Sequence, residues 1–167
     1  MKKILLALAL SIFPFVGSYA QVELSDGSLD LLKTVSRCNV YIDFSFGELF
    51  GLDEEHFCDY NGYWKRDKPV VISNFLNALN EQVSTGVVFG EYKDAPATLY
   101  VTILTVGDRG NFNCEVALQD AKKKTLAEMD GPYSEGSEGD NKIDLIKKGA
   151  AICGKDLGAF IQATVGK

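Results

Sequence analysis

The middle of the chain alternates between apolar and polar residues over three successive segments. From Asn111 to Gln119, every second residue is apolar, namely Phe112, Cys114, Val116 and Leu118. Similar segments cover 99–106 and 124–129, and short stretches rich in glycine, aspartate and lysine separate the three. A period of two is typical of strands that bury one face and expose the other. The pattern predicts a three-stranded antiparallel meander.

A fourth strand with the same period is predicted far upstream, at 38–46. Its apolar residues again take alternate positions, namely Cys38, Val40, Ile42, Phe44 and Phe46. A meander needs a larger sheet and a cover over its apolar face to be stable. We therefore expect this strand to join the meander in one antiparallel sheet of about four strands.

Two long helices are predicted by apolar residues spaced three and four apart. The first begins near Pro69, which suits a first helical turn, and stops before Gly86. Its apolar stripe is Ile72, Phe75, Leu76, Leu79 and Val83. The second runs from a cap at Asp140 or Asn141 to about Thr164. Three glycines, at 149, 154 and 158, weaken this helix by roughly 1 kcal/mol each relative to alanine, a cost that close packing against the sheet could offset.

The remaining segments carry weaker signals. Residues 21–28 are polar and expected to fray, 29–35 favours a short helix, and 87–92 could form a brief edge strand. Residues 47–67 have no period and are interpreted as a loop of about 20 residues, a length that is unusual unless the loop is functional. The order strand-helix-strand-strand-strand-helix predicts an α+β two-layer sandwich with both long helices on one face of the sheet.

The first 20 residues have the composition of a signal peptide. Two lysines precede an apolar run from Ile4 to Val16, and Ser18-Tyr19-Ala20 places small residues where signal peptidase cleaves. The run is shorter than the roughly 20 residues that a membrane-spanning helix needs. We therefore expect cleavage after Ala20, a single domain over 21–167, no membrane insertion after cleavage, and a periplasmic or secreted location.

Charge narrows the range of partners. The chain has 17 basic and 23 acidic residues, and loss of the two lysines in the first 20 residues changes its net charge from −6 to near −8. An acidic surface argues against nucleic acid and anionic lipid as partners.

Four cysteines in an exported chain favour disulfide bonds. Cys114 lies on the packed side of its strand and Cys153 on the apolar stripe of the last helix, so these two could meet in the core. By elimination, Cys38 would then pair with Cys58. The alternative is four reduced cysteines, and no zinc-type spacing is present.

No motif in the sequence indicates catalysis, a metal or a cofactor. His56 is the only histidine and is surrounded by acids, but it has no second nitrogen ligand nearby and no marked nucleophile. We expect a protein that is not an enzyme, with no cofactor and no metal. A secreted hydrolase using His56 and nearby acids is the alternative.

Residues 47–67 contain the best candidates for a binding site. Tyr60, Tyr63 and Trp64 are amphipathic rings that can stack on a sugar or anchor a protein partner, and Gly62 lets the chain present them. The competing interpretation is that these rings fold inward and cover one end of the core.

The chain is similar to small, uncharacterised exported proteins of gut and oral Bacteroidetes. The similarity is carried by the strand 38–44, the strand 99–106 and the helical segments 145–150 and 154–158. It implies an exported α+β domain and no particular activity. The sequence as a whole predicts a non-catalytic binding or accessory protein of the cell envelope that recognises a protein or glycan through 47–67; a purely structural role is the third possibility.

Overall fold

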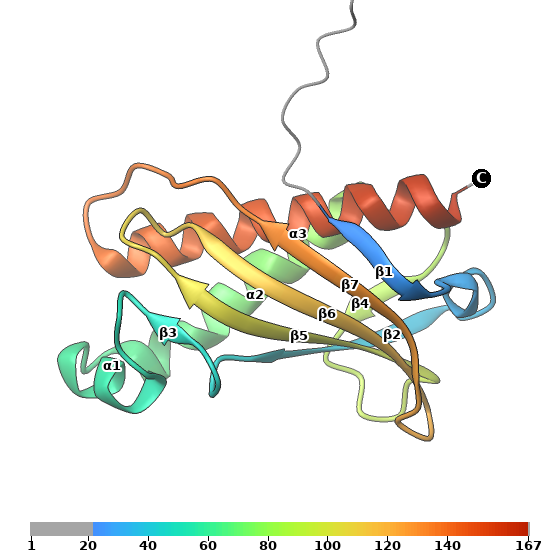
Figure 1. The fold of residues 1–167 in the computed structure, drawn as a ribbon, viewed down its shortest axis with the longest axis horizontal. Helices are drawn as coiled ribbons and strands as arrows, with labels where there is room; N and C mark the ends of the chain where they lie inside the picture. Colours follow the sequence, from blue (N-terminus) through green and yellow to red (C-terminus); the bar gives the residue numbers. More distant parts are fainter. Residues whose placement is uncertain (1–21, 167) are drawn as a thin grey trace, which may run out of the picture.

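The computed structural model describes residues 22–166. They form a seven-stranded mixed sheet with two long helices across one of its faces (Figure 1). The expected signal peptide, residues 1–20, lies outside these residues. In chain order, the elements are β1 (Glu23–Gly27), the 3-10 helix η1 (Asp30–Lys33), β2 (Arg37–Asp43), β3 (Glu48–Leu49), α1 (Glu54–Tyr60), α2 (Trp64–Gln82), β4 (Val88–Gly90), β5 (Ala97–Val106), β6 (Phe112–Asp120), β7 (Thr125–Tyr133) and α3 (Lys142–Val165).

The sheet combines parallel and antiparallel pairs. Its strand order is β1-β7-β6-β5-β2-β4, and β3 also pairs with β5. The predicted meander is present as β5, β6 and β7, all antiparallel, but β2 runs parallel to both β4 and β5. The α+β class is as predicted. The antiparallel sheet of about four strands is wrong, because the sheet has seven strands and is mixed.

The parallel pair follows from the connection between β2 and β5. This connection passes through α2, and a strand-helix-strand unit returns the chain to the sheet in its original direction. Alternating burial cannot reveal this, because a half-buried strand has the same period of two in either orientation. The strands that the prediction missed or left open, β1, β3 and β4, have five, two and three residues, too few for a clear pattern.

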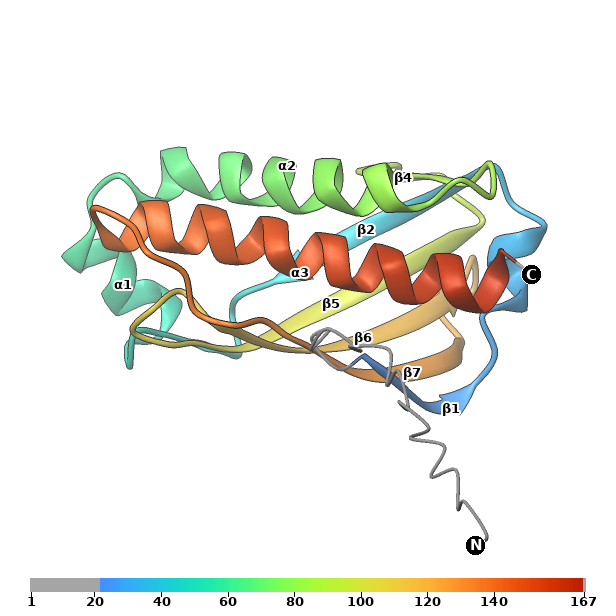
Figure 2. The same cartoon turned by 90° about the horizontal axis from the view of Figure 1, so that it is seen from above.

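The two long helices lie side by side on one face of the sheet, and no described element covers the other face (Figure 2). Two glycines of α3 allow the close contact with α2. A Cβ added to Gly154 would lie 2.1 Å from the carbonyl oxygen of Phe75, and one added to Gly158 would lie 2.7 Å from that of Leu79. These two glycines serve helix–helix contact. The third, Gly149, packs against the sheet as the sequence suggested, since a Cβ there would lie 2.0 Å from the carbonyl oxygen of Gly110 and 2.8 Å from the ring of Phe112 in β6.

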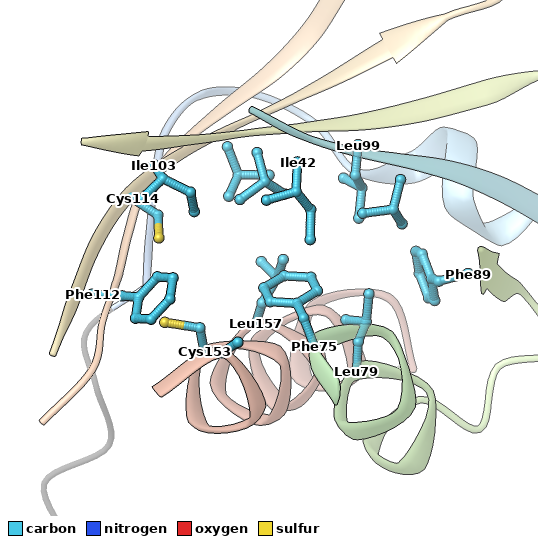
Figure 3. Close-up of a cluster of buried hydrophobic side chains, with 14 of the residues drawn as sticks. Ile42, Phe75, Leu79, Phe89, Leu99, Ile103, Phe112, Cys114, Cys153 and Leu157 are labelled. Atoms are coloured by element: carbon cyan, nitrogen blue, oxygen red, sulfur yellow. The ribbon is translucent and has the colours of Figure 1, made fainter. Parts of the chain in front are cut away.

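The core lies between the sheet and the two helices (Figure 3). Leu99, Ile103 and Phe112 point down from the strands and meet Phe75 and Leu157, which point up from the helices. All five are at least 97% buried. Burial of an aliphatic or aromatic side chain contributes about 1.5–3 kcal/mol each, so this interface is the main source of stability.

All four cysteines are free thiols in the structure. Cys38 is near the start of β2, whereas Cys58 is in α1, beyond the other end of that strand (Figure 1). A seven-residue strand is about 23 Å long, and a disulfide needs its two Cα atoms within about 7 Å. The Cys38–Cys58 bond predicted by elimination is therefore incompatible with this fold.

Cys114 and Cys153, in contrast, face one another across the core with their sulfur atoms turned inward (Figure 3). A hydrogen bond with Cys153, together with burial, raises the pKa of the Cys114 thiol well above its ordinary value, so this thiol stays protonated. The pairing of these two residues remains a prediction for the oxidised protein.

In oxidised protein, we expect a Cys114–Cys153 bond to raise the free energy of unfolding by roughly 2–4 kcal/mol, because it closes a loop of about 40 residues in the unfolded chain. Urea unfolding with and without reducing agent would measure this difference. The Cys114→Ala, Cys153→Ala double variant should show no dependence on the reducing agent. Titration of four free thiols in the unfolded protein after oxidation would contradict the pairing.

Candidate functional site

The segment 47–67 is folded, which corrects its interpretation as a loop. It contains β3, α1 and the first turn of α2. Asp53 caps α1, since its side chain accepts a hydrogen bond of 2.8 Å from the backbone N–H of His56. The backbone N–H of Phe50 donates to the carbonyl of Val106 in β5 at 2.7 Å and ties the segment to the sheet. A seven-residue helix is too short to show a reliable apolar period, so the sequence pattern missed it.

Trp64 is buried beneath this segment and is not an exposed binding residue. Only 1% of its surface is accessible, and its ring meets the edges of Phe44 and Phe57 at centroid distances of 5.4 and 5.3 Å. Its indole N–H donates to Glu54 Oε1 at 2.8 Å, and Lys68 Nζ donates to the same oxygen at 2.6 Å. For Trp64, the competing interpretation is correct: the ring closes one end of the core.

Tyr60 and Tyr63 lie on the surface, so for these two rings the inward-folding interpretation does not apply. Their accessible fractions are 66% and 64%. A cation lies over each ring, Lys142 Nζ at 4.5 Å from the centroid of Tyr60 and the Arg66 guanidinium at 4.5 Å from that of Tyr63. Such contacts hold an exposed ring in place. Tyr60 also stacks on Phe57, with the two ring centroids 6.5 Å apart.

The two tyrosines border a groove of about 550 Å³ at the N-terminal ends of α2 and α3, which lie at the same end of the helix layer (Figure 2). We call it the helix-end groove; its lining residues are Tyr60, Asn61, Tyr63, Arg66, Asp67, Asp140, Asn141, Lys142, Ile143, Asp144 and Lys147. Ten of the eleven are polar or aromatic. The groove therefore suits a polar ligand better than an apolar one.

Charges in the helix-end groove balance, with three carboxylates and three cations. Asp67 is only 8% accessible and lies 3.5 Å from Lys147 Nζ and 3.4 Å from the guanidinium of Arg66. At the start of α3, the hydrogen bond from Lys148 holds the pKa of Asp144 below its usual value. The groove thus presents fixed ionised groups and amide side chains, which can accept and donate hydrogen bonds.

A second, larger hollow of about 770 Å³ lies beside α1 and is lined by Ser45, Asp53, Glu54, Glu55, Cys58, Asp59, Trp64, Lys65 and Lys68. Its central acid, Glu54, already accepts hydrogen bonds from Trp64 and Lys68, and Asp53 caps α1. These acids hold the local fold together, so this hollow is the weaker candidate for a ligand site.

His56 lies on α1 and lines neither hollow. Its Nδ1 is 2.8 Å from the carboxylate of Asp53, and this hydrogen bond raises the pKa of His56 above its ordinary value. No hydroxyl or thiol of the described residues is hydrogen-bonded to the ring. The structure therefore shows how Asp53 orients the imidazole, and the hydrolase alternative stays a prediction.

Sequence reasoning missed the wall of the groove that α3 supplies. The sequence indicated only a helix cap at Asp140 or Asn141. Asn141 does cap α3, since its side chain accepts a hydrogen bond of 3.0 Å from the N–H of Asp144. Nothing local indicates that this helix start lies next to the start of α2, about 80 residues earlier in the chain.

No family model and no curated protein matches the chain. Among solved structures, it is similar to the dodecamer of PelC from Paraburkholderia phytofirmans, with 13% identity and a TM-score of 0.45 over 83% of this chain and 97% of that one. A point variant of the same dodecamer matches with 14% identity and the same TM-score over 83% and 98%. Neither the identity nor the TM-score is high enough to indicate a shared function.

Between residues 22 and 166, no helix combines the length and the apolar character that crossing a bilayer requires.

Proposed function

We propose that this chain is an exported, non-catalytic binding protein of the cell envelope, periplasmic or secreted, and that its helix-end groove binds a glycan without net charge. The observation that carries the proposal is the pair of exposed tyrosines, Tyr60 and Tyr63, on the border of a groove lined by acids, amides and cations. The signal-peptide composition of the first 20 residues supports the exported location.

Sugar rings have a C–H face that packs on aromatic rings and a rim of hydroxyls that need hydrogen-bond partners. Tyrosine provides such an aromatic face, and carboxylate and amide side chains provide acceptors and donors. The volume of about 550 Å³ lies within the range of small-ligand sites, roughly 300–1,000 Å³, and is large enough for a short oligosaccharide.

The balance of charge favours a neutral glycan over a highly charged polymer. Arg66, Lys142 and Lys147 are matched by Asp67, Asp140 and Asp144, so the groove has no net charge to attract a polyanion or a polycation. A protein partner is the competing class. Protein interfaces usually have an apolar centre, whereas the only aliphatic side chain that lines this groove is Ile143.

The test is binding of a panel of neutral and charged oligosaccharides to the purified protein, followed by calorimetry on those that bind. Replacing Tyr60 and Tyr63 together by alanine should weaken the affinity for a neutral oligosaccharide at least about tenfold, or 1.4 kcal/mol. Both rings are exposed, so the fold should be unaffected. Tyr41→Ala is the matched control, since Tyr41 is 51% accessible and lies on the sheet, away from the groove.

Three results would contradict the proposal. The first is that the double variant binds the oligosaccharide with unchanged affinity. The second is that the groove captures only a protein. The third is cleavage of the bound oligosaccharide, detected by mass spectrometry and abolished by His56→Ala, which would favour the hydrolase.

A further inference from the structure

The face of the sheet opposite α2 and α3 is uncovered in residues 22–166 (Figure 2). We call it the open sheet face; its central residues are Glu23, Ser25, Tyr41, Asp43, Tyr100, Thr102, Glu115, Ala117, Glu128 and Asp130. Their assignment to this face follows from the alternation of the strands, since the residues between them, such as Val116 and Met129, are buried in the core.

Strand register aligns four carboxylates in one row across five neighbouring strands. Directly paired residues along this row are Asp43, Thr102, Glu115, Asp130 and Glu23, from β2, β5, β6, β7 and β1. Like charges directly opposite one another on paired strands destabilise a sheet, so Glu115–Asp130 and Asp130–Glu23 are unfavourable pairs. None of the ion pairs formed by residues 22–166 involves Glu23, Glu115 or Asp130.

Beside this row lies a fixed aromatic pair. The rings of Tyr41 and Tyr100 are 5.0 Å apart, and the Tyr100 hydroxyl donates to Asp43 Oδ2 at 2.5 Å. Burial opposes ionisation of Asp43, but the hydrogen bonds from Ser45 and Tyr100 hold its pKa below the usual value. Because both rings are already ordered, a partner that packs on them loses little conformational entropy.

A hollow of about 240 Å³ opens between Tyr100 and the acids, because Ala117, which is paired with Tyr100, is small. Glu115, Glu128 and Asp130 line it together with Tyr100, and no cation does. A lysine or arginine side chain fits these surroundings, since its aliphatic stem packs on an aromatic ring while its charge pairs with carboxylates.

We propose that the open sheet face binds an extended, lysine- or arginine-rich segment of a partner protein. Adjacent strands are about 4.8 Å apart, so the carboxylate row extends over roughly 19 Å. A single small cation can occupy only part of such a row, whereas an extended basic segment can pair with several acids at once. This surface is separate from the helix-end groove, so either proposal can fail without the other.

Binding of labelled decalysine to the whole protein, measured by fluorescence anisotropy, tests this proposal. Replacing Glu115 and Glu128 together by glutamine should weaken decalysine binding at least tenfold and should leave the melting temperature unchanged or raised, because the like-charge contacts are relieved. The matched control is Glu55→Gln with Glu81→Gln, which removes the same charge from exposed positions of α1 and α2.

The control variant should bind decalysine as tightly as the original protein does. Added salt should weaken decalysine binding to both proteins steeply. If both double variants lost the same amount of affinity for decalysine, only net charge would matter and the proposal would be overturned. An absence of decalysine binding would also overturn it. Spermine or a glucosamine hexamer that binds as tightly as decalysine would overturn the assignment of a polypeptide partner.

Discussion

Replacing Trp64 by alanine is expected to lower the free energy of unfolding by about 3–5 kcal/mol, the usual loss when a buried tryptophan is truncated. The ring packs between Phe44 and Phe57 and is 1% accessible, so its removal leaves a cavity at the end of the core. Glu54 also loses the hydrogen bond from the indole N–H. Urea or guanidinium unfolding measures the loss directly.

Tyr63→Ala is the control for this experiment, because the two residues are adjacent and both aromatic but Tyr63 is 64% accessible. We expect its effect on the free energy of unfolding to stay within about 0.5 kcal/mol. A loss below about 1 kcal/mol for Trp64→Ala, or equal losses for both variants, would mean that the indole does not occupy the core.

Gly154→Ala is expected to destabilise the protein by about 1–3 kcal/mol, although alanine is the better helix former by about 1 kcal/mol. The added Cβ would lie 2.1 Å from the carbonyl oxygen of Phe75 and 2.9 Å from its carbonyl carbon. Both are backbone atoms of α2, so no side-chain rotation can relieve the contact and the two helices must separate. The measurement is the free energy of unfolding, again by denaturant.

The same substitution at Gly62 provides the control, because a Cβ there meets nothing within 4 Å and the backbone is not left-handed. Gly62→Ala should therefore be neutral or slightly stabilising, through reduced entropy of the unfolded chain. Stabilisation by Gly154→Ala would contradict the close approach of α3 to α2 that the fold requires.

These two positions also support the candidate binding site. The helix-end groove exists because α2 and α3 start side by side, and the contact at Gly154 keeps them close. Trp64 and Glu54 join α1 to the first turn of α2, where Tyr60 and Tyr63 are attached. A glycan site on this scaffold needs both contacts to hold its two aromatic rings at a fixed spacing.

Trp64 shows how far the aromatic residues of 47–67 could be interpreted from sequence. Tyr60, Tyr63 and Trp64 all have an apolar ring with a polar group, so composition alone assigned them the same role. In the structure, the Trp64 ring turns inward, and its indole N–H donates a hydrogen bond to Glu54, ten residues earlier in the chain. Tyr60 and Tyr63 remain exposed.

What the sequence determined by itself is the set of local elements with a clear period. The alternation around Cys114 places β6 within a residue of its observed bounds, and the apolar stripe of α3 places that helix, because both patterns record which side of one element is buried. Sequence periodicity also indicated that Cys114 and Cys153 point into the same core, as the structure shows (Figure 3).

Only the tertiary structure decided how these elements are joined. Three features bring together residues that are far apart in the chain. They are the parallel pairing of β2 with β5, the alignment of Glu115 with Asp130, and the groove between the starts of α2 and α3. Periodicity describes the environment of each residue but not the identity of its neighbour. Register, strand direction and the sides of a groove depend on that neighbour, which is chosen by the packing of the whole core.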